Sequence, residues 1–178
     1  MILSMWALGY VSVYRQDFCL GYSLAQLWGK ASIKGKTMIE IVIYGDPVPQ
    51  GRPRFTKSGH AYDPQRSQNY KQLVRFWVTQ HLKKIHGFKP FENAMCVELI
   101  FYLGIPSSWS KKKRTEAING VIRPIARNGD VDNMIKAILD AGNNLLWADD
   151  CIITDISAKK RYTGELARVE IKINEVQP

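Results

Sequence analysis

Apolar and polar residues follow regular patterns from Met38 onward, and these patterns predict much of the secondary structure. Residues 39–44 alternate in hydrophobicity with a period of two, which is typical of a strand with one face in the core. Residues 94–103 are apolar almost without a break and predict a second, buried strand. Residues 65–85 space their apolar side chains three and four positions apart, which predicts an amphipathic helix bearing Tyr70, Leu73, Val74, Trp77, Val78 and Leu82.

The rest of the chain predicts a loop, two more helices and two more strands. Proline and glycine mark residues 46–54 as a loop. The basic segment 108–118 favours a short helix, and residues 131–144 predict a longer one. Residues 151–162 and 166–173 are predicted as strands joined in a hairpin at Thr163-Gly164-Glu165. The order β-α-β-(α)-α-β-β indicates an α+β fold with helices packed against a mixed β-sheet.

Residues 1–37 differ from this pattern, since they show neither a helical nor a strand period. We therefore expect the functional domain to span residues 38–178 and residues 1–37 to be an appendage or the product of an upstream start. The opening stretch has no basic residue before Arg15, which is not the pattern of a secretory signal. No apolar run is long enough to cross a bilayer, so no membrane partner is expected.

The chain is basic, with a formal net charge of +9 and a pI near 9.5. Such a charge favours a polyanionic partner such as nucleic acid, although a solvated basic surface accounts for it equally well. The three cysteines are scattered, without a CxxC pair, and the three histidines form no ligand-spaced cluster with them. This distribution disfavours a thiolate zinc site and a disulfide framework, and a reducing cytoplasm is the simplest location.

Acidic residues gather in residues 129–150, GDVDNMIKAILDAGNNLLWADD. Asp130 and Asp132 stand at the predicted start of a helix. At about 100° per residue, Lys136 and Asp140 follow Asp132 along one side of that helix. The opposite side is apolar, with Val131, Met134, Ile135, Ile138 and Leu139.

One interpretation makes these acids caps and turns. Asp130 is then an N-cap, Asp132 complements the helix dipole, and Lys136 is its partner one turn later. The pair Asp149-Asp150 is then a turn before a strand. Asp140 fits less well because it lies toward the helix C-terminus, where it pairs with Lys136 or has a tertiary role.

The other interpretation is a metal centre. Mg²⁺ prefers oxygen ligands and keeps several waters, so two or three carboxylates suffice to hold it. Such an ion activates water and stabilises the leaving oxygen in phosphodiester cleavage. A lysine beside the acids adds positive charge where the transition state becomes negative.

The string Asp130-Val131-Asp132-Asn133, with Lys136, Asp140, Trp147 and Asp149-Asp150, resembles the signature of RusA-family Holliday-junction resolvases. Residues 45–64, GDPVPQGRPRFTKSGHAYDP, resemble the N-terminal strand and loop of that family, and together the matches span residues 38 to 173. The resemblance implies a RusA-like fold and a homodimeric, Mg²⁺-dependent endonuclease that cuts four-way DNA junctions by paired incisions. Mn²⁺ is an alternative metal.

The resemblance also implies roles for single residues. Asp130, Asp132 and Asp150 are expected to bind metal and take part in catalysis, with Lys136 as the active-site lysine; Asp149 and Asp140 occupy further motif positions. Family members often carry basic residues directly before the first motif aspartate. Here that place is taken by Asn128-Gly129, so phosphate contact is expected from Arg123 or Arg127 instead.

Three basic clusters are candidates for binding DNA, because carboxylates alone would repel it. They are Arg52, Arg54 and Lys57 in the predicted loop; Lys111, Lys112, Lys113 and Arg114; and Lys159, Lys160 and Arg161. Each cluster taken alone is better explained as a solvated face, and it is the presence of three clusters around the acidic residues that favours DNA binding. Phe55 or Trp109 could stack at an opened junction, although burial in the core is the commoner use of such residues.

Two competing functions stay open at this point. One is a non-catalytic basic DNA-binding module whose acids are caps and turns. The other keeps the nuclease chemistry but acts on flaps, forks or RNA, and no residue in the sequence decides among these substrates. A homodimer is expected because paired incisions call for two equivalent sites.

Overall fold

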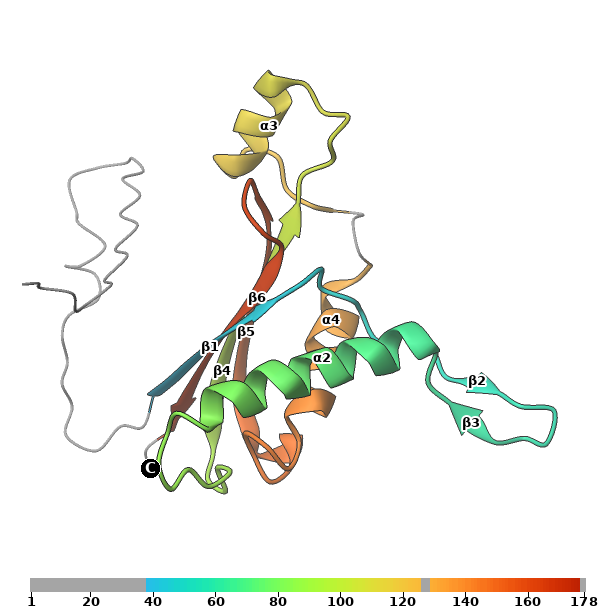
Figure 1. The fold of residues 1–178 in the computed structure, drawn as a ribbon, viewed down its shortest axis with the longest axis vertical. Helices are drawn as coiled ribbons and strands as arrows, with labels where there is room; N and C mark the ends of the chain where they lie inside the picture. The colour runs from blue at the N-terminus through green and yellow to red at the C-terminus, as the bar shows by residue number, and fades with distance from the viewer. Residues whose placement is uncertain (1–37, 126–128, 177–178) are drawn as a thin grey trace, which may run out of the picture. The chain divides into compact units, whose positions relative to one another are not determined.

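A four-stranded mixed sheet organises the chain in a computed structural model that describes residues 38–125 and 129–176 (Figure 1). Its strand order is β1-β6-β4-β5; β6 is antiparallel to β1 and β4, and β4 is parallel to β5. The elements are β1 (Met38–Tyr44), β2 (Arg54–Phe55), β3 (Ala61–Tyr62), α2 (Gln65–Leu82), β4 (Met95–Gly104), α3 (Lys111–Ile118), α4 (Val131–Gly142), the 3₁₀ helix η1 (Asp150–Ile152), β5 (Ile153–Thr163) and β6 (Arg168–Glu175). The predicted α+β class, with helices against a mixed sheet, is confirmed.

The core lies between one face of the sheet and the helices α2 and α4. Ile41, Ile171 and Leu99 are neighbours across β1, β6 and β4, and each is 1% exposed. From the helices, Val74, Val78, Met134 and Ile138 pack into the same cluster. The period-two and period-3.6 patterns of the sequence thus meet at one apolar layer, whose burial is the main source of stability.

Helix α4 begins and ends close to its predicted limits. Its buried residues are Met134, Ala137, Ile138, Ala141 and Gly142. Val131, predicted on this buried face, is instead 38% exposed, because the first turn of the helix extends beyond the core. At the other end, Gly142 is required because a side chain there would collide with the indole of Trp147.

The hairpin predicted between β5 and β6 at Thr163-Gly164-Glu165 is wrong. Strand β4 lies between the two strands and bonds to both. β5 ends with Thr163 beside Gly104, and β6 starts with Arg168 beside Tyr102, so residues 164–167 cross the end of β4. The buried backbone of β4 needs hydrogen-bond partners on both edges, and β5 and β6 supply them.

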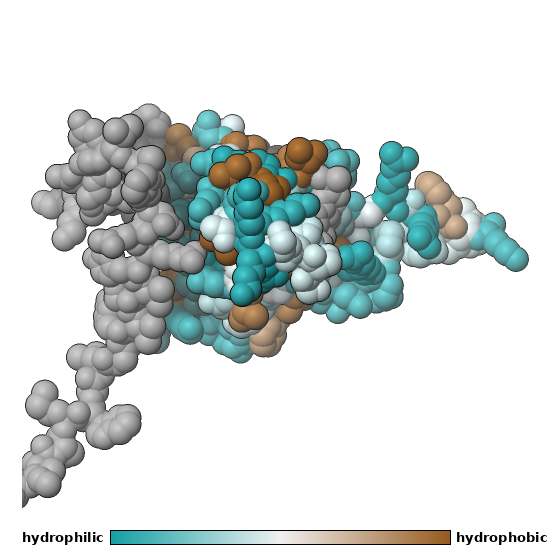
Figure 2. Space-filling view, turned by 90° about the horizontal axis from the view of Figure 1, so that it is seen from above, coloured by the Kyte–Doolittle hydropathy of each residue, from teal (hydrophilic) through white to brown (hydrophobic). Residues whose placement is uncertain are grey.

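A small hairpin of β2 and β3 occupies a region whose first part is predicted as loop. It is closed by hydrogen bonds between Thr56 and His60, with Gly59 at a positive φ of 83°. Every residue from 52 to 62 is exposed, so the hairpin packs against no described element. It lies just before the start of α2 (Figure 1), and its surface is mainly hydrophilic with one apolar area (Figure 2).

Some predictions fall outside the described residues. These are the appendage at residues 1–37 and the proposed phosphate contact of Arg127. Among the helices of residues 38–125 and 129–176, none combines the length and the apolar character needed to cross a membrane.

Candidate active site

Two aspartates stand exposed at the start of α4. Asp130 is the N-cap, with extended backbone (φ −80°, ψ 149°), yet its side chain makes no capping hydrogen bond. Asp132 follows in the first turn. Neither carboxylate has a hydrogen-bond or ion-pair partner among the residues that the structure describes. Side-chain capping therefore does not account for Asp130, although both charges still suit the positive end of the helix dipole.

The second acidic pair is used differently. Asp149 caps η1, because its side chain accepts a 2.9 Å hydrogen bond from the amide of Cys151. Hydrogen bonds from the thiol and the amide of Cys151 lower the pKa of Asp149. Asp150 is the first residue of η1 and is half-buried. The turn interpretation therefore holds for Asp149.

Within one chain, Asp150 lies at the opposite end of α4 from Asp130 and Asp132. Helix α4 is about 18 Å long at 1.5 Å per residue. The chain then turns back at its C-terminal end, where the amide of Asn144 bonds to the carbonyl of Trp147 and the indole lies against Gly142. Asp150 follows three residues after that indole, as the first residue of η1.

The course of strand β5 also shows that Asp150 is far from Asp130 and Asp132. Lys160 donates a 2.8 Å hydrogen bond to the carbonyl of Gly129, directly before the start of α4. β5 begins at Ile153, beside η1, seven residues or about 23 Å before Lys160. Among the described residues, accordingly, no group of three or more His, Cys, Asp or Glu side chains is close enough to hold a metal ion.

Asp140 and Lys136 lie on the predicted stripe of α4 but have different surroundings. Asp140 pairs with Lys71 of α2 at 2.8 Å, and Lys71 also bonds to Asp63 at 3.0 Å. Burial alone would lower the pKa of Lys71, but its bonds to Asp140 and Asp63 outweigh this and raise it. Lys136 is exposed. Asp140 therefore has a tertiary role, and its partner is Lys71 and not Lys136.

The ion pairs of Lys71 with Asp63 and Asp140 lie close to the first turns of α4, and the lowered pKa of Asp63 reflects this. Hydrogen bonds from Lys71 and then from Gln50 lower it, and the more distant charge of Lys136 contributes in the same direction. The main-chain N–H of Gln50 also donates a 2.8 Å hydrogen bond to the main-chain carbonyl of Asn133, next to Asp132. The loop between β1 and β2 is thus joined by a hydrogen bond to the first turn of α4.

Sequence reasoning missed Lys71, Asp63 and Gln50. Lys71 and Asp140 are 69 positions apart, so no local spacing relates them. A lysine among the polar positions of a helix is also the ordinary composition of a solvated face.

The basic clusters differ in how free their charges are. Arg52, Arg54 and Lys57 are exposed on and beside the β2–β3 hairpin. Phe55 is 72% exposed there, so its expected burial is wrong: the hairpin has no core to bury it in. Figure 2 shows hydrophilic side chains around this part of the surface.

In α3, the four basic residues divide into two pairs. Lys113 lies 4.2 Å from the ring centre of Trp109, and Arg114 donates to the carbonyl of Pro106. Trp109 packs edge-on against Tyr162, with ring centres 5.2 Å apart, but it is only half-buried and lies outside the core cluster, so its expected burial in the core is wrong. Lys111 and Lys112 are exposed and extend their amines into solvent, so these two lysines are the ones available to a ligand.

In β5, Lys159 is exposed, while the amine of Lys160 donates to the carbonyls of Ile125 and Gly129. Lys160 therefore binds the main chain at Gly129, directly before α4 starts. Burial and the nearby charge of Arg123 lower the pKa of Arg161. Two like charges kept together in this way indicate a surface suited to an anion.

Comparisons with known proteins agree with the motif. The sequence model of the family described as "Endodeoxyribonuclease RusA" matches residues 23–174. A Bacillus subtilis (strain 168) protein named YqaN, described as uncharacterized, is 37% identical over 143 residues. The match covers 78% of this chain and 96% of that protein.

Proposed function

The chain belongs to the RusA endodeoxyribonuclease family, and we propose that it resolves four-way DNA junctions by Mg²⁺-dependent, paired phosphodiester hydrolysis as a homodimer. The observation that carries this proposal is the pair of exposed carboxylates, Asp130 and Asp132, at the start of α4 without a partner among the described residues. Leaving two such groups unpaired suits the binding of a cation. Lys136 lies one helical turn beyond Asp132.

The donor chemistry fits a hard divalent cation, because carboxylate oxygens are its preferred ligands. Asp130 and Asp132 supply two carboxylates from one subunit, and the remote Asp150 of the same chain does not join them. We infer that Asp150 of the partner subunit completes each site. A two-fold axis would then create two equivalent sites together, as paired incisions require.

The side chains divide the chemistry among them. Asp130 and Asp132 hold the cation, which when bound supplies Lewis-acid stabilisation and an activated water. Lys136 places a positive charge beside the phosphate that undergoes cleavage, where it stabilises the developing negative charge. Lys71 and Asp63 act as positioning residues, since they fix the side of α4 that carries Asp140.

Basic and aromatic side chains outside the site bind the DNA arms in this proposal. Lys111, Lys112 and Lys159 offer exposed amines to phosphates. Phe55 is a large apolar side chain held in solvent by a short hairpin, and it is suited to inserting between base pairs at the junction centre.

A cleavage assay tests the function directly. The protein is incubated with a synthetic four-way junction, a fork and a linear duplex, each with Mg²⁺ and with a chelator. Symmetric incisions confined to the junction and dependent on Mg²⁺ support the proposal. Binding without cleavage would favour a non-catalytic DNA-binding module, and preferential cutting of forks, flaps or RNA would favour a nuclease of different substrate.

A further inference from the structure

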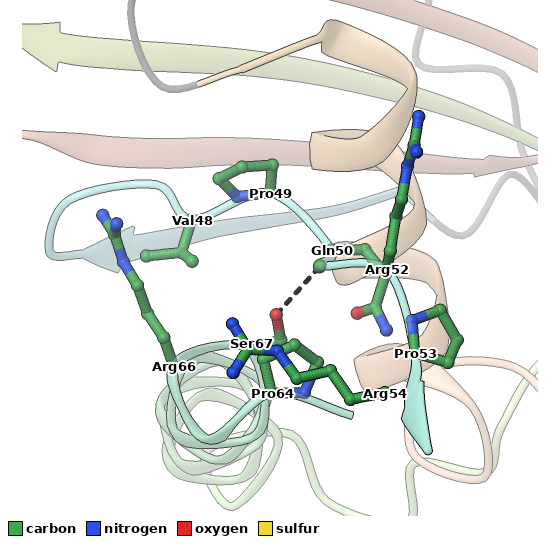
Figure 3. A pocket seen from close by; sticks show the side chains of 10 residues that line it. Val48, Pro49, Gln50, Arg52, Pro53, Arg54, Pro64, Arg66 and Ser67 are labelled. Carbon is green, nitrogen blue, oxygen red and sulfur yellow. Dashed lines mark hydrogen bonds between the residues drawn. The ribbon is translucent and has the colours of Figure 1, made fainter. Parts of the chain in front are cut away.

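A pocket lies between the loop that precedes the β2–β3 hairpin and the start of α2 (Figure 3). It has a volume of about 470 Å³ and opens to solvent. Three arginines line it: Arg52 from the loop, Arg54 from the first position of β2 and Arg66 from the first turn of α2. Figure 3 shows Arg54 reaching toward Ser67 from one side and Arg66 beside Val48 on the other.

The positive charge of this pocket is not neutralised by any acidic residue in its lining. No acidic residue lines the pocket, and none of its three arginines forms an ion pair or hydrogen bond with a described group. Other arginines of the chain are engaged: Arg75 donates to two main-chain carbonyls, and Arg168 pairs with two glutamates. Arginine side chains that line one pocket without an acidic partner favour an anionic ligand there.

The backbone of the pocket is fixed in advance. The amide of Gly51 donates a 2.9 Å hydrogen bond to Ser67 Oγ, which ties the loop to α2. A Cβ at position 51 would lie 2.8 Å from Pro64 Cγ, so the two segments meet this closely only because residue 51 is glycine. Because residue 51 is tied to α2, this part of the loop costs less to order when a ligand binds.

The N-terminus of α2 also contributes positive electrostatic potential to the pocket. The helix has 18 residues, its N-cap is Pro64 without a side-chain cap, and its first turn contains no acid. Its free amide groups therefore add a partial positive charge beside Arg66. The pocket is also joined to the candidate active site, because Gln50, another lining residue, bonds through its amide to Asn133.

We propose that this pocket binds a backbone phosphate of the DNA substrate, on the strand that also passes the start of α4. The guanidinium groups of Arg54 and Arg66 bind the phosphate oxygens, and Arg52 contacts a neighbouring phosphate. This inference rests on the proposed function only in taking DNA as the ligand. An open pocket continuous with an exposed basic hairpin suits a polymer better than a free nucleotide.

The test measures binding of a four-way junction by fluorescence anisotropy over a range of salt concentrations, without divalent metal so that the DNA stays intact. Arg66→Gln and Arg54→Gln are each expected to raise the Kd by about tenfold. The slope of log Kd against log salt should fall by about 0.9 for each phosphate that the variant no longer binds. Lys84→Gln, which removes an exposed charge in the turn just beyond the C-terminal end of α2, is the matched control and should change neither quantity beyond the general effect of one charge.

A modified substrate makes the assignment specific. Junctions carrying a single uncharged methylphosphonate are scanned along one strand; at one position the wild type should lose affinity while Arg66→Gln does not. Absence of any such position, or equal effects of Arg66→Gln and Lys84→Gln, would overturn the inference. Competition by a mononucleotide as strong as by DNA would also overturn it in favour of a free nucleotide. Cleavage by the wild type is measured separately, so a pocket that binds phosphate in a protein that does not cut DNA would support this inference and contradict the proposed function.

Discussion

The amine of Lys71 donates a 2.8 Å hydrogen bond to Asp140 Oδ2, and this bond joins α2 to the helix that carries Asp130 and Asp132. The same amine bonds to Asp63, directly before α2. The ammonium group of Lys71 thus joins the start of α2 to α4, which lies 69 positions further along the chain. Asp140 belongs to the acidic motif, but its role in the structure is to orient α4.

Replacing Lys71 with methionine should therefore shift the position of α4 and its carboxylates, while it lowers the free energy of unfolding only slightly. The pair is partly exposed, so the expected loss in unfolding free energy is only about 1 kcal/mol. Single-turnover cleavage should fall several-fold while the Kd for the junction stays unchanged, because the acids are misplaced and the DNA surface is intact. Urea unfolding and single-turnover kinetics measure the two effects. Lys84→Met, in the turn just after α2, is the control, and an equal loss of cleavage in that variant would rule out a positioning role for Lys71.

The network also predicts a dependence of stability on pH. Because the pKa of Asp63 is lowered from its usual 3.8, its ionised form stabilises the fold above that value, and this contribution disappears as pH falls through the lowered pKa. The pKa of Lys71 is raised from 10.5, so its contribution is complete below 10.5 and disappears as pH rises through the raised value. Asp63→Asn should hence destabilise the protein at neutral pH and much less at about pH 2. Urea midpoints for both proteins across this range measure it, and a constant difference would contradict the role of the carboxylate.

The exposed lysines of α3 should act on DNA binding alone. Because Lys111 and Lys112 extend into solvent, Lys111→Glu with Lys112→Glu is expected to leave the melting temperature nearly unchanged. The double variant should weaken junction binding and flatten its salt dependence by about 0.9 for each phosphate that it no longer neutralises. Anisotropy titrations at several salt concentrations measure both. An unchanged slope would show that this cluster is a solvated face.

Phe55 offers a test that separates insertion into DNA from general packing. Phe55→Ala should not alter stability because the side chain is 72% exposed, but it should reduce opening of the junction and the cleavage that follows. The signal of 2-aminopurine at the junction centre reports the opening. Leu166 is 71% exposed in the connection between β5 and β6, so Leu166→Ala is a matched control. If both variants behave like the wild type, Phe55 does not insert.

Periodicity in the sequence predicts β1, α2 and α4 because each has one face in the core, and a nearly continuous apolar run predicts the buried strand β4. The neighbours of β5 are mispredicted because strand order is a long-range property: a turn of a few residues can join adjacent strands or cross a third. The same limit applies to the site. The spacing of Asp130 and Asp132 predicts that both lie at the start of α4. The position of Asp150 near the opposite end of that helix cannot be predicted from the spacing.

That separation makes the completion of each site by a second subunit the central claim, and a mixed dimer tests it most directly. Asp132→Asn and Asp150→Asn homodimers should both bind the junction, the former as tightly as the wild type or more so, and neither should cut it. A heterodimer of the two variants has one intact site if Asp150 acts in the partner subunit, and none if it acts within its own chain. We expect the purified heterodimer to nick one strand of the junction in Mg²⁺, whereas the wild type makes paired incisions. A heterodimer as inactive as the two homodimers would contradict the shared site.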